Sequence, residues 1–228
     1  MKILSLMKLQ MTGLLKFGDG TIKVFNQRFG MLPISFYYLL SLYFDNINKK
    51  KDLYLISWIN GILMMKYFEL STNAKHPIDL YTIGMEYASF VGSGKFKTLE
   101  YDIGNFAKFQ IENEPFLEYK NEKPESPYLI VAGFQAGGGT VSHRNIINCL
   151  PLSINKENKI ATFLNATKEE MIKRNLLEKF ESFIQGKIDE VLPLQQEVYQ
   201  KILPVTKIEE LKKIERYELN EIFKHIRC

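Results

Sequence analysis

The feature that most constrains the fold is a stretch rich in glycine and alanine that begins at Pro127. Proline suits the first position of a helix, because the N–H that it lacks would have no partner there. A helix from this point carries four small residues on one face, at spacings of three and four: Ala132, Gly133, Ala136 and Gly137. Glycine inside a helix costs about 1 kcal/mol relative to alanine. We therefore expect a large neighbour to approach this bare face, either a packed element of the protein or a bound ligand or partner.

Three consecutive glycines, Gly137, Gly138 and Gly139, continue the stretch. Such a run can form a nest of backbone amides that binds an anion, but anions prefer the N-terminus of a helix. We therefore expect the helix, which the pattern allows as far as Ser142, to terminate at these glycines. Together with Gly133 they form a predicted glycine face.

The composition is that of a folded protein without a strong electrostatic footprint. The chain has 228 residues, 46% of them hydrophobic, and 30 basic against 26 acidic residues. This size allows one sizeable domain plus an appendage, and the charge balance argues against a dedicated DNA-binding protein without excluding one. The two cysteines, Cys149 and Cys228, form no disulfide framework. With no secretory signal, and with the uncharged apolar run 29–44 too short to span a bilayer, we expect a cytoplasmic protein.

The order of the predicted elements favours an α+β fold. Alternation and helical periodicity predict a hairpin at 11–29, helices at 33–47, 52–69 and 78–91, strands at 98–103 and 107–112, the glycine-rich helix, and strands at 143–152 and 158–165. This order lacks the strand–helix alternation of a parallel sheet. We expect an antiparallel sheet with helices packed on one face. The helices at 33–47 and 52–69 are apolar nearly all round, and a homodimer interface is our preferred explanation.

The composition changes at Thr167, which begins a plausible capping box with Glu170. Nearly everything beyond is helical, and Pro193 and Pro204 are predicted to break it into three helices. Residues 167–228 contain 12 basic and 12 acidic residues, so this helical extension is neutral. We divide the chain into a domain at 1–166 and an extension at 167–228. The extension serves packing or oligomerisation, or docks a macromolecular partner.

Catalytic and metal-binding signatures are weak. His143, Arg144 and Cys149 fall on one predicted strand, where His143 and Cys149 would share a face. Two ligands do not make a closed zinc site, and no CxxC, HExxH or GxSxG motif is present. The segment 92–95 (GSGK) lacks two residues of a phosphate-binding loop and is better explained as a helix end followed by a strand. We expect no enzymatic activity and assign no catalytic residue.

Aromatic and methionine side chains are concentrated in the predicted core elements. Beside a helix with few side chains, such large and flexible apolar groups can leave room for an apolar ligand. Ordinary core packing without a void is the alternative. As wall residues of a ligand site we select Trp58, Tyr81, Tyr128 and Phe134.

Several of these segments together resemble the vinyl-reductase domain family, named after the 4-vinyl reductase proteins and described as a predicted hydrocarbon-binding domain. The resemblance covers residues 78–165. It rests on the order and spacing of the strand pair 98–102 and 109–113, Pro115-Phe116 with Glu118, the segment 131–137 (VAGFQAG), and the closing hairpin that ends Ala161-Thr162-Phe163.

The resemblance implies an α+β fold akin to vesicle-tethering subunits that hold an acyl chain and to haem–nitric-oxide sensor domains. It also implies a tendency to dimerise and a role in small-molecule sensing. Zinc-binding members place Cys and Glu ligands across the closing strands. Cys149 fills one such position, but Ala161 stands where a Cys and Ile146 where a Glu would be expected. We therefore expect neither a metal nor another cofactor.

Two functions follow as hypotheses. The first is a non-enzymatic, dimeric regulatory module that binds or senses an apolar small molecule. The second is a structural or adaptor protein, whose apolar helices and C-terminal extension dock a macromolecule such as transcription machinery or DNA.

Overall fold

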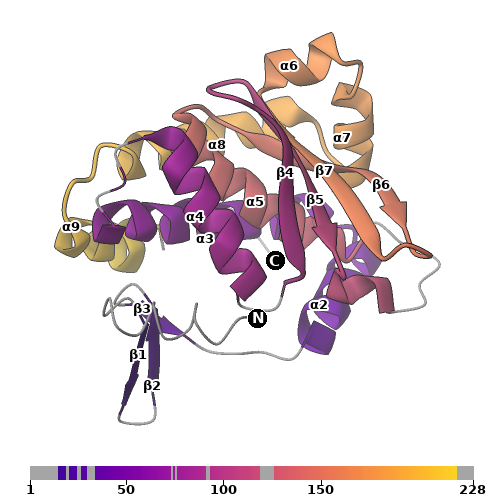
Figure 1. The fold of residues 1–228 in the computed structure, drawn as a ribbon. Helices are drawn as coiled ribbons and strands as arrows, with labels where there is room; N and C mark the ends of the chain where they lie inside the picture. Colours follow the sequence, from indigo (N-terminus) through magenta and orange to yellow (C-terminus); the bar gives the residue numbers. More distant parts are fainter. Residues whose placement is uncertain are drawn as a thin grey trace.

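The computed structural model describes residues 15–18, 21–24, 27–29, 34–72, 74, 76–90, 93–118 and 126–219. It confirms the α+β class, with a four-stranded antiparallel sheet covered by helices (Figure 1). The elements are β1 Leu15–Gly18, β2 Thr21–Val24, β3 Gln27–Phe29, α2 Ile34–Asn46, α3 Lys50–Thr72, α4 Pro77–Phe90, β4 Lys95–Asp102, β5 Phe106–Glu112, η1 Pro115–Glu118, α5 Tyr128–His143, β6 Asn148–Asn155, β7 Ile160–Ala166, α6 Lys168–Lys173, α7 Leu177–Ile184, α8 Ile188–Ile202, α9 Ile208–Lys213 and η2 Ile214–Glu218.

The main sheet has the strand order β4-β5-β7-β6, and every neighbouring pair is antiparallel. Strand β5 alternates as its sequence predicts, because Ala107, Phe109 and Ile111 are fully buried while the residues between them are partly exposed. The ring of Phe109 stacks on Phe96 of β4 at 6.0 Å and on Phe163 of β7 at 5.3 Å between ring centroids. This inner face of the sheet is therefore filled by aromatic rings.

Strand β4 departs from the simple alternation predicted for it. The register with β5 shifts between Thr98 and Glu100, so that Leu99 is the extra residue of a β-bulge. Its side chain is 38% exposed, and that of Ile103 in the following turn is 57% exposed. The alternation of Leu99, Tyr101 and Ile103 with polar residues predicts that these three side chains share the buried face. This is wrong for two of them, because the bulge turns Leu99 outward and Ile103 lies in the turn after the strand.

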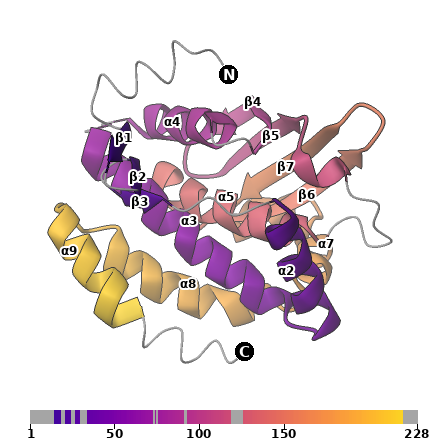
Figure 2. The same ribbon diagram turned by 90° about the horizontal axis from the view of Figure 1, so that it is seen from below.

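The helices are stacked in layers on the sheet. Figure 2 shows α5 between the sheet and α3, and α8 on the far side of α3. Helix α4 packs against α5 and β4. The helices predicted at 33–47, 52–69 and 78–91 correspond to α2, α3 and α4, with ends that differ by at most three residues. None of the helices in the described part of the chain has both the length and the apolar character needed to cross a bilayer.

Helix α5 continues past the three glycines and ends at His143, so the predicted termination at Gly137–Gly139 is wrong. Arg144 caps the helix in a left-handed conformation, with φ 57°. The additional turn is stabilised at Thr140, whose hydroxyl donates to the Ala136 carbonyl at 2.9 Å and accepts from the backbone N–H of Ile147 at 3.0 Å. Strand β6 therefore begins only at Asn148, and the predicted strand shared by His143, Arg144 and Cys149 does not exist.

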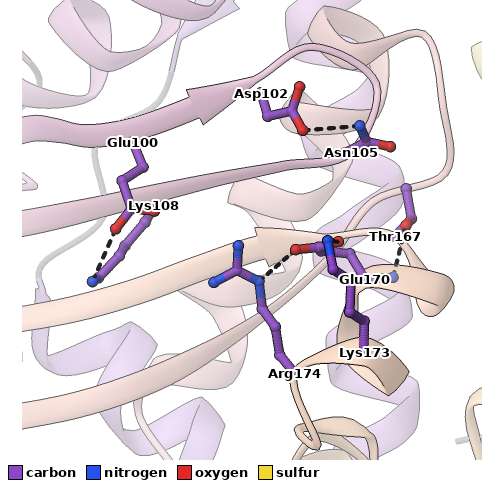
Figure 3. A network of polar contacts seen from close by, with 8 residues as sticks. All are labelled: Glu100, Asp102, Asn105, Lys108, Thr167, Glu170, Lys173 and Arg174. Atoms are coloured by element: carbon purple, nitrogen blue, oxygen red, sulfur yellow. Dashed lines mark hydrogen bonds and ion pairs between the residues drawn. The ribbon is translucent and has the colours of Figure 1, made fainter.

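The C-terminal extension starts with the predicted cap. The Thr167 hydroxyl accepts from the backbone N–H of Glu170 at 3.2 Å (Figure 3). The Glu170 carboxylate does not reach back to Thr167 but accepts from Arg174 at 2.7 Å. The guanidinium of Arg174 in turn lies 4.1 Å from the ring centroid of Phe106. These contacts fix α6 to the end of the sheet.

Pro193 does not break the extension as predicted, because it lies inside α8. A proline inside a helix removes one hydrogen bond, but Val191, Val198 and Ile202 on the same helix are fully buried. Tertiary packing of this face outweighs the local cost. The helices end instead at left-handed Asn175 (φ 57°) and Gln185 (φ 54°), and α8 ends before Pro204 as expected.

The extension packs closely against α3 and β6. Phe180 of α7 meets Tyr54 of α3 edge to face at 5.5 Å between ring centroids. On α8, the Gln195 amide donates to the Asn148 side chain at 2.9 Å, and Asn148 also accepts from the Tyr54 hydroxyl at 3.1 Å. The buried Lys66 ammonium donates to Glu69 and to the carbonyl of Leu203, both at 2.7 Å.

The N-terminal hairpin is present as β1 and β2, paired from Leu15↔Val24 to Gly18↔Thr21, and β3 adds a third strand. The remaining residues of the predicted hairpin lie outside the described residues, as do Gly92 and Cys228 and the end of the last predicted helix beyond 219.

Candidate ligand-binding site

The backbones of α3 and α5 lie in direct contact, and glycines make this approach possible. A Cβ atom added at Gly137 would lie 1.9 Å from the Trp58 carbonyl oxygen, and one at Gly133 would lie 2.5 Å from the Tyr54 carbonyl oxygen. The arrangement is reciprocal, because a Cβ on Gly61 of α3 would lie 2.1 Å from the Phe134 carbonyl oxygen. The large neighbour of the bare face is therefore a helix of the same chain.

The other two glycines of the predicted glycine face point elsewhere. A Cβ on Gly138 would lie 3.3 Å from the methyl carbon of Met65, a flexible side-chain end. One on Gly139 would lie 3.0 Å from the Asn165 amide nitrogen and 3.2 Å from Ile147. The four glycines thus face three different neighbours: the α3 backbone, the end of a methionine side chain and the sheet.

A pocket lies where α3, α4 and α5 meet, next to Gly138. Its lining is uncharged and consists mainly of large apolar side chains and glycines: Gly61, Met64, Met65, Phe68, Tyr81, Gly84, Met85, Tyr87, Phe134, Gln135, Gly138 and Gly139. The free volume is about 20 Å³, which is roughly what a single water molecule needs. In this conformation the protein's own side chains fill most of the space.

The structure brings two of the four predicted wall residues, Tyr81 and Phe134, together at this pocket. Trp58 and Tyr128 lie elsewhere. The fully buried Trp58 donates its indole N–H to the Ile147 carbonyl at 3.0 Å, where α3 meets the start of β6. Tyr128 packs against Phe163 at 5.6 Å between ring centroids, at the opposite end of α5.

Tyr128 belongs to a separate buried polar contact. Its hydroxyl donates to the Glu114 carboxylate at 3.0 Å, and both side chains are almost fully buried. Burial raises the pKa of Glu114 to about 7, although hydrogen bonds from the backbone of Phe116 and Leu117 and from Tyr128 oppose the rise. This carboxyl group therefore titrates near neutral pH, away from the pocket.

The end of the Met65 side chain lies against two glycines of the pocket wall. A Cβ on Gly84 of α4 would lie 2.3 Å from the Met65 methyl carbon, and Gly138 of α5 faces the same methyl group. The end of this side chain thus sits in a notch between two glycines on facing helices. Gly84 was not among the predicted wall residues. The sequence did contain a signal for it, because a glycine inside an otherwise apolar helix indicates a close neighbour.

Three rings cluster on the α4 side of the pocket. The ring centroids of Tyr81 and His143 lie 4.8 Å and 4.7 Å from that of Tyr101. Burial raises the pKa of Tyr81, raises that of Tyr101 to about 12 and lowers that of His143 to about 4. All three are neutral at pH 7, so the site presents polar atoms but no net charge.

The described residues contain no group of three His, Cys, Asp or Glu side chains arranged to hold a metal ion. Cys149 is fully buried, and burial raises the pKa of its thiol. Its backbone N–H donates to the Tyr54 hydroxyl at 2.9 Å. The surroundings of this cysteine are those of a core residue.

No protein-family model matches the chain, and no curated protein sequence matches it. Among solved structures, it is similar to the phenol-responsive sensory domain of the transcription activator PoxR, determined with phenol. The TM-score is 0.57 at 12% sequence identity, and the match covers 77% of this chain and 98% of that domain. The chain therefore shares the α+β fold of a small-molecule sensory domain from a transcription activator.

Proposed function

We propose that this protein is a non-enzymatic sensory module that binds a small, mainly apolar molecule between α3, α4 and α5, and that it is a divergent relative of the vinyl-reductase domain family. The observation that carries the proposal is the uncharged pocket, lined by methionines, aromatic rings and glycines. Its occurrence in a fold shared with a phenol-responsive domain supports the assignment.

Ligand entry requires Met65 to leave the notch between Gly84 and Gly138. Methionine is suited to this movement, because it is unbranched and adapts to irregular spaces. The free volume of about 20 Å³ would then grow by the volume of the displaced side chain. Apolar pockets of roughly 150 Å³ accept benzene-sized molecules, so a single aromatic or alicyclic ring is the size that we expect.

The test is a titration with phenol, followed through the methionine methyl signals in NMR of protein labelled with 13C at these methyl groups. Met64, Met65 and Met85 line the pocket, whereas Met171 is a fully buried methionine of α6 outside it. We expect saturable shifts at the pocket methionines and none at Met171. Gly138→Leu, which fills the pocket, should abolish these shifts. The absence of shifts with both phenol and toluene, or shifts that are equal at Met171, would refute the proposed site.

We further propose that the protein acts as a homodimer formed through α2. This helix exposes three large apolar side chains at spacings of three and four residues: Phe36 at 45%, Leu39 at 62% and Tyr43 at 58%. From Ile34 to Phe44 the helix has no charged residue. Such a stripe is typical of a surface that is buried by a second helix.

Sedimentation velocity tests the dimer with a matched pair of variants. Leu39→Glu places a charge in the stripe, and Ile172→Glu places one at a similarly exposed apolar residue on α6 (51% exposed). We expect wild type and Ile172→Glu to sediment as dimers and Leu39→Glu as a monomer. A monomeric wild type, or a dimeric Leu39→Glu, would contradict the interface.

A further inference from the structure

Three buried polar atoms beside the pocket form no hydrogen bond to any described residue: the Tyr81 hydroxyl, Nε2 of His143 and Oδ1 of Asn165. The three residues are only 3%, 2% and 0% exposed. Buried polar groups nearly always have a partner, and an exception calls for a physical explanation. The Thr98 side chain lies close to the Tyr81 hydroxyl and offsets part of the rise in the Tyr81 pKa that burial causes. The two side chains nevertheless do not form a hydrogen bond of normal geometry.

The residues that carry these atoms lie in the pocket wall or next to it. Tyr81 lines it, and its ring meets that of His143 edge to face at 6.1 Å between centroids. Asn165 lies behind Gly139 and donates its amide to the carbonyl of Gln135 at 3.2 Å. Tyr81 is thus part of the pocket wall, His143 contacts Tyr81, and Asn165 contacts the wall residues Gln135 and Gly139.

On the sheet, an alanine lies between two polar side chains. Tyr101, Ala107 and Asn165 lie in one row across β4, β5 and β7, according to the register of the strands. The middle position carries only the small side chain of Ala107, which is fully buried. The two flanking polar side chains therefore lie on the same face of the sheet, with an alanine between them.

The hydrogen-bonding capacity of the three atoms selects the chemistry of a partner. Oδ1 of Asn165 only accepts, and the Tyr81 hydroxyl both donates and accepts. His143 accepts at Nδ1 from the backbone N–H of Gly104 at 3.1 Å, and its ring also interacts with the backbone of Asp102. The remaining nitrogen, Nε2, offers a donor or an acceptor according to the tautomer of the neutral ring. A hydroxyl group can satisfy either kind of atom. A carboxylate would find no cation among the lining residues.

We infer that the pocket has a polar end, formed by Tyr81, His143 and Asn165, and that its ligand is a neutral ring-sized molecule carrying a hydroxyl group. This inference rests on the proposed function and narrows its ligand class from a hydrocarbon to an alcohol or phenol. Tyr81 is the specificity-determining residue, because its ring lines the apolar part and its hydroxyl belongs to the polar end.

The experiment compares phenol with toluene, which carries a methyl group in place of the hydroxyl, by the same methionine-methyl titration. A purely apolar pocket prefers toluene, because the phenol hydroxyl loses hydration on entry. We expect wild type to bind phenol at least as tightly as toluene. In Tyr81→Phe the ratio of phenol to toluene affinity should fall about fivefold or more, the value of one neutral hydrogen bond.

Tyr101→Phe is the matched control. It removes a hydroxyl from the same ring cluster, but one that is directed to the Ser142 carbonyl at 3.4 Å, so the ratio should stay at the wild-type value. Thermal unfolding gives a second reading that needs no ligand. Tyr81→Phe should not lower Tm, since it deletes a hydroxyl that has no partner.

The possible results separate the two proposals. If toluene binds wild type more tightly than phenol, or if Tyr81→Phe leaves the ratio unchanged, the polar end is refuted while the apolar site stands. If neither probe binds wild type, the proposed function fails and the ligand class fails with it. A clear drop in the Tm of Tyr81→Phe would also contradict the inference, because it would show that the hydroxyl is already paired.

Discussion

The contact between α3 and α5 at Gly137 can be tested by adding one methyl group. In Gly137→Ala the new Cβ would lie 1.9 Å from the Trp58 carbonyl oxygen and 2.7 Å from the backbone nitrogen of Ile62. Ordinary contact begins near 3.4 Å, so α3 and α5 would have to separate locally by about 1.5 Å. Overpacking a core typically costs about 1–3 kcal/mol. The clash here is with backbone that cannot rotate away, and we expect the upper end of that range.

Gly138→Ala is the control, because it adds the same methyl group one residue along the same helix. Its Cβ would lie 3.3 Å from the end of the flexible Met65 side chain and 4.0 Å from the Gly61 carbonyl oxygen, which is an ordinary contact. Both variants gain about 1 kcal/mol of helix propensity. We therefore expect Gly138→Ala within about 1 kcal/mol of wild type, and Gly137→Ala less stable than Gly138→Ala by about 3 kcal/mol.

Urea denaturation followed by circular dichroism measures both free energies of unfolding, with the m value as a check that the transition remains two-state. A difference between the two variants below about 1 kcal/mol would show that α3 and α5 do not touch through their backbones, and the reasoning about this helix pair would be wrong.

Two further predictions concern buried or capping polar groups. The pKa of Glu114 is raised from 4.5 to about 7 in the folded protein, so its contribution to stability is present below pH 4.5 and lost as the pH rises through 7. By linkage, the stability of wild type relative to Glu114→Gln should fall by up to about 3 kcal/mol between pH 4.5 and pH 8, as measured by urea denaturation across that range; a constant difference would contradict the raised pKa. Thr167→Ala removes the cap of α6 and should cost about 1 kcal/mol, with Thr167→Ser restoring the loss in the same assay, whereas a neutral Thr167→Ala would mean that the cap contributes nothing.

Patterns confined to one element predicted the fold well. The alternation in β5 requires only that one face of the strand be buried, and this holds whatever covers it. The helical periodicity of α2, α3 and α4 gave their ends to within three residues for the same reason. The face on which Leu99 lies was predicted wrongly, because a bulge depends on how β4 pairs with β5. The sequence of one strand does not determine this pairing.

Other errors came from tertiary contacts that outweigh local preferences. Gly137–Gly139 and Pro193 both predicted the end of a helix, yet both lie inside one. The bare surface around Gly133 indicated that a neighbour approaches closely. The sequence of this helix alone could not identify the neighbour as α3. The four aromatic residues selected as a wall come from three helices. Their grouping depends on how each helix is rotated about its axis, which only the assembled core determines.

The contact between α3 and α5 also determines which wall of the pocket can yield. Two helices that touch through their main chains form a stiff unit, since any sliding would drive carbonyl oxygens into Cα atoms. Helix α4 meets the pocket through the flexible or planar side chains of Met85 and Tyr81 and through the notch at Gly84. A guest that needs more space than the displaced Met65 side chain provides must therefore be accommodated by outward displacement of α4. The resistance of that helix to displacement thus sets the upper size limit for ligands.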